Sequence, residues 1–81
     1  MWKKIAEGVY AAATGPLLFT VRRGTKAWEA EIQIRSAIPE MMLWKEGRFP
    51  DADTAKLTAV TAAKELLAAT IEDVESLIPQ R

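Results

Sequence analysis

The chain has 81 residues, contains neither cysteine nor histidine, and carries 11 basic and 11 acidic side chains. Disulfides, thiolate catalysis and cysteine-ligated metals are therefore excluded, and the commonest general base and metal ligand is missing. We expect no enzyme, no catalytic residues, no cofactor, no metal and no small-molecule substrate. A chain of 81 residues has room for one core, so we expect a single domain over residues 1–81.

The first predicted element covers residues 2–13. Its large apolar side chains recur at helical spacing, at Trp2, Ile5, Val9 and Tyr10. Gly15-Pro16 ends the segment, whereas Gly8 interrupts it. These features favour a short N-terminal helix, and a strand over residues 9–14 is the alternative.

The segment from Leu17 to about Arg35 predicts a β-hairpin with one apolar and one polar face. If Gly24-Thr25 is a two-residue type II′ loop, Arg23 opposes Lys26 and Val21 opposes Trp28. The apolar face then contains Leu17, Phe19, Val21, Trp28, Ala30, Ile32 and Ile34. A slip of one residue would turn all of these side chains toward water, so the assignment of the faces is well specified.

The remaining chain predicts a turn over residues 36–39, a third strand over residues 41–46, and a long helix. Pro50 ends the strand, Asp51 or Asp53 caps the helix, and the helical pattern reaches about Ile78. Such a helix is about 42 Å long, whereas a compact chain of this size is about 30 Å across. The helix must therefore project or bend, and a capping-box-like sequence at Thr70 marks a candidate break.

The helix carries two neighbouring apolar seams. The first, of smaller side chains, contains Ala52, Ala55, Ala59, Ala62, Leu66 and Ala69. The second contains Val60, Leu67, Ile71, Val74 and Ile78. Together they cover roughly 200°, more than one sheet requires. The second seam either packs on the N-terminal helix or binds a second copy or another protein.

These elements predict an α+β fold, in which a three-stranded antiparallel sheet is packed by a long C-terminal helix and a short N-terminal helix.

Charge is unequally divided between the predicted sheet layer and the predicted helical layer. Residues 1–49 carry eight basic and five acidic side chains (+3), and residues 50–81 carry three and six (−3). Charge complementarity between the layers explains this division without a ligand.

Two sets of side chains are candidates for binding. Tryptophan and methionine are enriched at protein interfaces, and the expected protein-contact residues are Trp2, Met41, Met42 and Trp44. A charged rim of Arg22, Arg23, Lys26 and Arg35 is the basis of an alternative, a nucleic-acid-binding protein that uses the basic face of the hairpin. Glu29 and Glu31 dilute that face, and we expect them to pair with its arginines across the strands.

No signal peptide is predicted, because Glu7 and Gly8 interrupt the apolar sequence that follows the basic Lys3-Lys4. No window approaches the ~18 consecutive apolar residues of a membrane span. We therefore expect a cytoplasmic protein with no membrane partner.

The order of the predicted elements over residues 17–69 resembles small βββα domains of bacterial and phage proteins of unknown function. The residues that carry the resemblance are Trp28-x-Ala30-x-Ile32-x-Ile34, a further strand, and Phe49-Pro50-Asp51-Ala52-Asp53-Thr54-Ala55 leading into the helix. HicB-type antitoxins have a related plan and sometimes a trailing Ile-Pro like Ile78-Pro79. Their usual Gly-Asp-Thr-x-Glu-Glu-Ala entry is only half matched, by Asp53-Thr54-Ala55-Lys56.

The chain is also similar in size and style to some phage-encoded anti-CRISPR inhibitors. These resemblances imply a regulator or inhibitor encoded by a phage or another mobile element. We therefore expect a small non-catalytic binding protein that acts through protein–protein contacts and self-associates as a homodimer.

Overall fold

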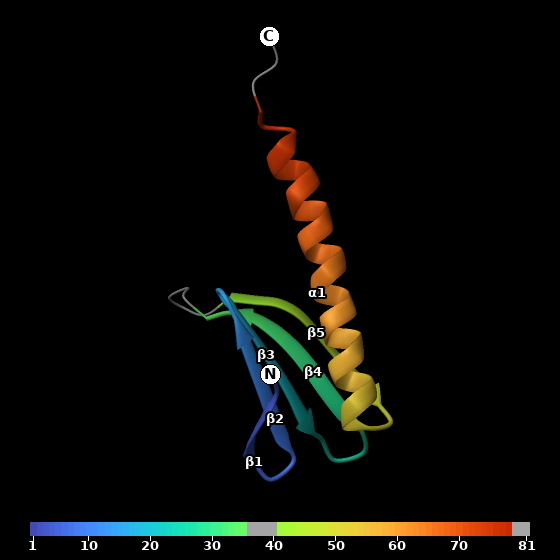
Figure 1. The fold of residues 1–81 in the computed structure, drawn as a ribbon. Coiled ribbons are helices and arrows are strands. Elements are labelled where there is room, and N and C mark those ends of the chain that lie inside the picture. The colour runs from blue at the N-terminus through green and yellow to red at the C-terminus, as the bar shows by residue number, and fades with distance from the viewer. Residues whose placement is uncertain (36–40, 79–81) are drawn as a thin grey trace.

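The computed structural model describes residues 1–35 and 41–78. Five strands form one antiparallel sheet in the order β1-β2-β3-β4-β5, and each strand pairs with the next along the chain (Figure 1). The strands are β1 (Lys3–Ala6), β2 (Val9–Thr14), β3 (Leu17–Arg23), β4 (Trp28–Ile34) and β5 (Met41–Phe49). The helix α1 (Ala52–Glu75) contacts β3, β4 and β5 on one face of this sheet. The prediction of an α+β fold with a long C-terminal helix is confirmed.

The N-terminal segment is a β-hairpin, so the predictions of an N-terminal helix and of a three-stranded sheet are wrong. Lys4 opposes Tyr10 in β1 and β2, and β2 extends the sheet beyond β3. Gly8 and Gly15 have φ values of 71° and 55°, which glycine adopts in tight turns without a steric cost. Two such turns divide the segment into strands, and the alternative strand over residues 9–14 is the one observed as β2.

The β3–β4 loop contains four residues, 24–27, instead of the predicted two. Val21 therefore opposes Ala30 rather than Trp28, and Arg23 opposes Trp28 rather than Lys26. Gly24 does not have a positive φ, so a type II′ turn at this position is also wrong. The observed pairing of β3 with β4 differs from the predicted pairing by two residues. Side chains along a strand alternate between the two faces of the sheet with a period of two residues. Every residue consequently stays on its predicted face.

The core lies between this apolar face and α1. Its buried side chains are Phe19, Val21, Ala30, Ile32, Phe49, Ala55, Ala59 and Ala63. Small alanine side chains let the helix backbone lie close to the sheet, as the first seam predicts. Trp2 extends the core beyond β3 through an edge-on contact with the Phe19 ring, 6.0 Å between centroids. The Lys56 ammonium lies 4.0 Å from the centroid of the Tyr10 ring, a cation–π distance.

The third predicted strand is confirmed as β5, which continues to Phe49. Irregularities in its pairing with β4 lie opposite Ala30 and Gln33. Arg48, in the first of these, has a φ of 70°, an uncommon left-handed conformation for a residue other than glycine. The bend allows Phe49 to reach the core. The turn predicted over residues 36–39 lies outside the described residues.

The helix begins at the predicted cap and continues without a break. The Asp51 carboxylate accepts a hydrogen bond from the Thr54 backbone N–H at 2.7 Å, which lowers the pKa of Asp51. The candidate break at Thr70 is wrong, because its hydroxyl bonds the Leu66 carbonyl within an intact helix. The helix projects past the sheet, which gives the molecule extents of 55 × 25 × 21 Å (Figure 1). No helix among the described residues has the length and apolar character needed to cross a membrane.

Candidate docking surface

Large apolar side chains are exposed on two neighbouring elements at the end of the molecule from which α1 projects. On α1 they are Leu66, Leu67, Ile71 and Val74, followed by Leu77 and Ile78, and on β5 they are Met41, Met42 and Leu43. We call this set the apolar end. Ile71 and Val74 are 57% and 58% exposed, well above what core positions show. Contiguous exposure of this kind is typical of interaction surfaces.

A shallow groove of about 110 Å³ joins the two elements. It is lined by Leu17, Ile32, Leu43, Ala63, Leu66, Leu67 and Thr70. Because Leu43 and Leu66 line the same groove, the start of β5 lies at the level where α1 leaves the sheet. The helix and Leu43 therefore flank one recess, whereas Met42 opposes Gln33 and points to the other face of the sheet at the same end of the molecule.

The second seam of α1 gives this surface a regular pattern. Leu67, Ile71, Val74 and Ile78 are four, three and four residues apart, the spacing at which helices pack on one another. Val60, which precedes them along the seam, is partly buried, but the later members are all exposed. The expected N-terminal helix, which was one candidate cover for this seam, does not exist.

The edge of the sheet at β5 is open. β5 is nine residues long and, among the described residues 1–35 and 41–78, pairs only with β4, so its outer side is an edge of the sheet. The opposite edge, β1, has four residues, an irregularity after Lys4, and lysines at Lys3 and Lys4, all of which discourage further pairing. Charged side chains also occupy the second part of β5, from Lys45 onward. The apolar part of this edge is therefore residues 41–44, within which the pairing with β4 shifts register between Met42 and Trp44.

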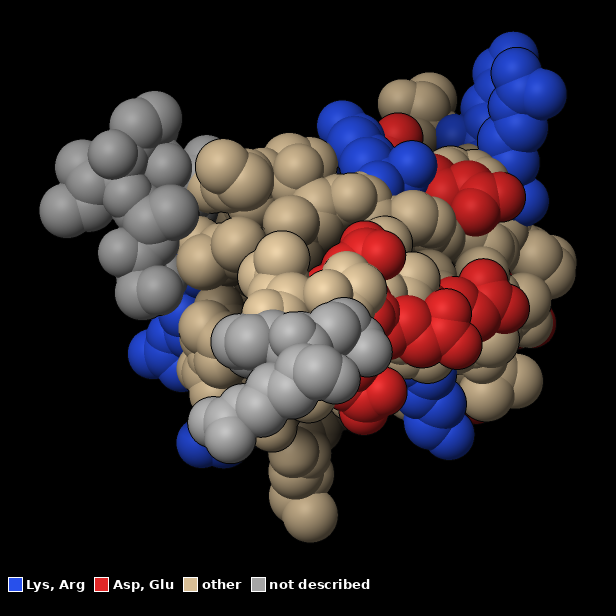
Figure 2. Space-filling model, turned by 90° about the horizontal axis from the view of Figure 1, so that it is seen from above, with Lys and Arg blue, Asp and Glu red and all other residues tan. Residues whose placement is uncertain are grey.

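Acidic side chains accompany the apolar ones at the end of the helix. Residues 65–78 contain Glu65, Glu72, Asp73 and Glu75 and no basic residue. Seen from above, acidic side chains gather on one side of the projecting helix, beside a surface without charged groups (Figure 2). Among the described residues, no ion pair connects α1 to the sheet, since both ion pairs lie within the first four strands and their turns. The complementarity expected between the layers is thus not made through direct ion pairs.

The structure separates the four predicted protein-contact residues. Met41 and Met42 lie at the apolar end, 56% and 44% exposed. Trp44 opposes Ile32 and packs against the core, as does Trp2 from the other end of the sheet. Four residues of α1 that were not among the predicted contacts belong to this surface, namely Leu66, Leu67, Ile71 and Val74. The second seam was the signal that pointed to them.

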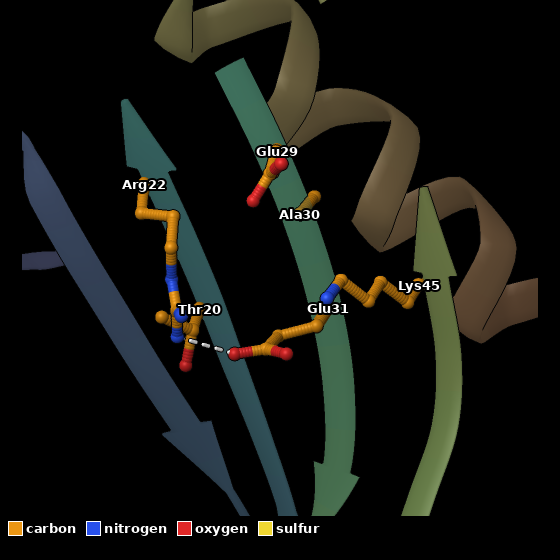
Figure 3. A pocket seen from close by; sticks show the side chains of 6 residues that line it. All are labelled: Thr20, Arg22, Glu29, Ala30, Glu31 and Lys45. Carbon is orange, nitrogen blue, oxygen red and sulfur yellow. Dashed lines mark hydrogen bonds and ion pairs between the residues drawn. The ribbon is translucent and has the colours of Figure 1, made fainter. Parts of the chain in front are cut away.

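The predicted charged rim is distributed over different parts of the sheet. Arg22 lies on the face away from α1, where its guanidinium donates a hydrogen bond to the Glu31 carboxylate at 2.5 Å (Figure 3). Arg23, the next residue along β3, points to the opposite face. Lys26 lies in the β3–β4 loop, and Arg35 follows the other end of β4. These four side chains do not form one basic strip.

The face of the sheet away from α1 is polar over β3, β4 and β5, whereas Ala11, Ala13 and Leu18 make it apolar toward β1 and β2. Thr20, Arg22, Glu29, Glu31 and Lys45 surround a shallow depression, across which Lys45 extends from β5 over β4 (Figure 3). The predicted cross-strand pairing of the glutamates is confirmed for Glu31. No group of three or more potential acidic ligands comes together in the described part of the chain.

At the turn between β1 and β2, the hydrogen bond and ion pair that Glu7 makes with Lys4 (3.1 Å) lower the pKa of the Glu7 carboxyl group.

No protein-family model matches this chain, and no curated protein or solved structure shows significant similarity to it.

Proposed function

We propose that this chain is a small non-catalytic binding protein of the regulator or inhibitor type, which acts through protein–protein contacts made by its apolar end and self-associates. The observation that carries the proposal is the exposed apolar surface formed by Ile71, Val74 and their neighbours on α1, which Leu43 on β5 adjoins across the groove. Covering apolar surface releases about 25 cal/mol for each Å² removed from water. A phage or bacterial origin and a cytoplasmic location belong to the same proposal, and the cysteine-free composition is compatible with a reducing compartment.

The surface has the composition of a binding site with a central apolar cluster and a charged margin. Ile71 and Val74 project from a rigid helix, so little conformational entropy of the backbone is lost when a partner binds. Met42 supplies a flexible side chain that adapts to an irregular partner surface. Glu72, Asp73 and Glu75 lie beside them and would select a partner with basic side chains.

The proposal is tested by the solution mass, measured by light scattering over a dilution series. We expect the mass to exceed that of the 9.0 kDa chain at high concentration. Ile71→Glu should shift the dissociation to at least tenfold higher concentration, because it places a charge in the apolar surface. Ile5→Glu is the matched control, since Ile5 is 62% exposed but lies on the opposite edge of the sheet. An unmodified chain that stays monomeric would remove the self-association, and an associated mass that Ile71→Glu leaves unchanged at every concentration would contradict docking through the apolar end.

The alternative of nucleic-acid binding through the hairpin stays a prediction. It needs Arg22 and Arg23 to act together, but neighbouring residues of a strand point to opposite faces, and Arg22 is already bound to Glu31. Binding that falls steeply with salt in a mobility-shift assay would support it.

A further inference from the structure

Strand β5 and helix α1 run in opposite directions past the apolar end. β5 starts there, at Met41, and leads away to Phe49, whereas α1 returns and continues beyond the sheet. The helix passes the start of β5 near Leu66, which shares the groove with Leu43. From Leu66 to Glu75 it extends nine more residues, about 14 Å. The open edge and the uncovered helix surface thus lie at the same end of the molecule.

We infer that the partner of the apolar end is a second copy of this chain, related by a two-fold axis that passes beside residues 41–44 of β5. This inference rests on the proposed function and specifies its partner. Antiparallel pairing of β5 with its symmetry mate satisfies the open backbone groups of both edges by the same contacts. The joined sheet has ten strands and carries both helices on one face. The sheet of each copy then lies alongside the projecting helix of the other, which covers Ile71 and Val74.

Charge favours this antiparallel arrangement over a parallel pairing of the two helix ends. A parallel pair would bring together two segments that each carry Glu72, Asp73 and Glu75 and no basic residue. In the antiparallel arrangement each acidic segment instead approaches the body of its partner, where residues 1–49 have a net charge of +3. Like charges repel and opposite charges attract across an interface, so only the second arrangement gains from this distribution.

The area of the surface also requires the strand edge to take part. The exposed seam over residues 67–78 is about 18 Å long and a helix is about 10 Å wide, a footprint of roughly 180 Å². Stable interfaces bury about 600 Å² or more on each partner. The seam alone is too small. The edge of β5, the groove and the surface that receives the partner's helix supply the difference.

A pair of spin labels distinguishes the arrangements, and the absence of native cysteine makes single-site labelling clean. One label is attached at Met42→Cys, close to the inferred axis, and the other at Glu75→Cys, on the projecting helix. We expect short distances between the Met42 labels of the two copies, because paired strands lie about 5 Å apart. Labels at Glu75 should be at least ~27 Å apart, twice the projection of the helix past the edge. Light scattering on each labelled sample first establishes its mass.

Several outcomes would overturn the inference, and they differ in their consequences. Short distances at Glu75 would establish a parallel pairing of helix ends. Long distances at Met42 in a dimer would place the interface elsewhere. A monomer at every concentration would remove the second copy as partner but not the docking of a different protein at the apolar end, which is the broader part of the proposed function.

A second pair of variants tests the strand edge without a label. Met42→Lys should weaken dimerisation at least tenfold, because lysine on an edge strand opposes further pairing. Ile5→Lys makes a comparable change on the other edge and should leave the dimer unchanged. Equal effects of the two substitutions would contradict pairing through β5.

Discussion

Arg22 and Glu31 form the most buried charged contact that the structure describes. Glu31 is only 7% exposed although it lies on the face of the sheet that no helix covers. Neighbouring side chains, including Arg22 and Lys45, shield it from water (Figure 3). The Arg22 side chain remains 49% exposed, so solvent reduces the electrostatic part of the interaction. The arginine matters chiefly because it satisfies a carboxylate that water reaches poorly.

Arg22→Ala should therefore lower the free energy of unfolding by about 1–2 kcal/mol, the usual cost of leaving a buried charged acceptor without its partner. Urea denaturation monitored by tryptophan fluorescence measures this change. Arg35→Ala is the control, because Arg35 is exposed and makes no ion pair with the described residues. We expect it to change stability by less than about 0.5 kcal/mol. Equal losses for the two variants would mean that the Glu31 contact contributes nothing specific.

The helix is the element whose start and packing are most directly encoded. Asp51 caps its first turn, and Ala55, Ala59 and Ala63 are buried against the sheet. No residue of α1 beyond Ala63 is buried, although Leu66 and Leu67 still line the groove beside the sheet. The helix therefore has two parts with different stabilising contacts. The first is held by its cap and the core, and the second is held by backbone hydrogen bonds.

The cap predicts a dependence of stability on pH. The hydrogen bond from Thr54 holds the pKa of Asp51 below its usual value of 3.8. A carboxyl group with a lowered pKa stabilises the folded state above its unfolded pKa, and this contribution is lost as pH falls through the folded pKa. Asp51→Asn retains a capping side chain that does not titrate. The melting temperature of the unmodified chain should therefore fall more steeply below about pH 3.8 than that of Asp51→Asn.

The control for this measurement is Asp53→Asn, because Asp53 lies in the first turn but does not cap it. We expect Asp53→Asn to keep the acid dependence of the unmodified chain. Identical pH profiles for Asp51→Asn and the unmodified chain would show that the cap does not contribute.

The whole molecule has a small globular part and a long projection, with extents of 55 × 25 × 21 Å. Such a shape leaves an 81-residue chain with a modest core, and four of the eight buried hydrophobic side chains in the described part of the chain are alanines. Association at the apolar end would add buried surface that one chain cannot provide. Folding and association should then be coupled.

This coupling makes stability depend on protein concentration. We expect the melting temperature to rise with concentration, because mass action favours the associated state by up to about 1.4 kcal/mol for each tenfold increase in free partner. Ile71→Glu should move this dependence to at least tenfold higher concentration while leaving the melting temperature at high dilution nearly unchanged. Calorimetry over a hundredfold range of concentration measures both quantities. A melting temperature that is independent of concentration in the unmodified chain would contradict the coupling.

The sequence alone determined the two strands of the β3–β4 hairpin, the apolar face that they present, the start of α1 at one of two candidate caps, Asp51 or Asp53, and the two seams of that helix. These features are carried by local periodicity and by capping residues, so a short window of sequence contains them. The exposed second seam also indicated the surface that the structure presents at its far end. The resemblance to βββα domains and HicB-type antitoxins stays a prediction.

Only the tertiary structure decided the secondary structure of residues 2–13, the register of β3 against β4, and the partial burial of Trp2 and Trp44. Apolar residues in the first segment fit a helix and a strand equally well, and pairing with β3, the next strand along the chain, selected the strand. The register depends on the whole β3–β4 interface, since a two-residue shift leaves the same side chains on the same face. Whether a tryptophan is buried depends on which elements pack over it, and that is settled by contacts between segments far apart in the chain.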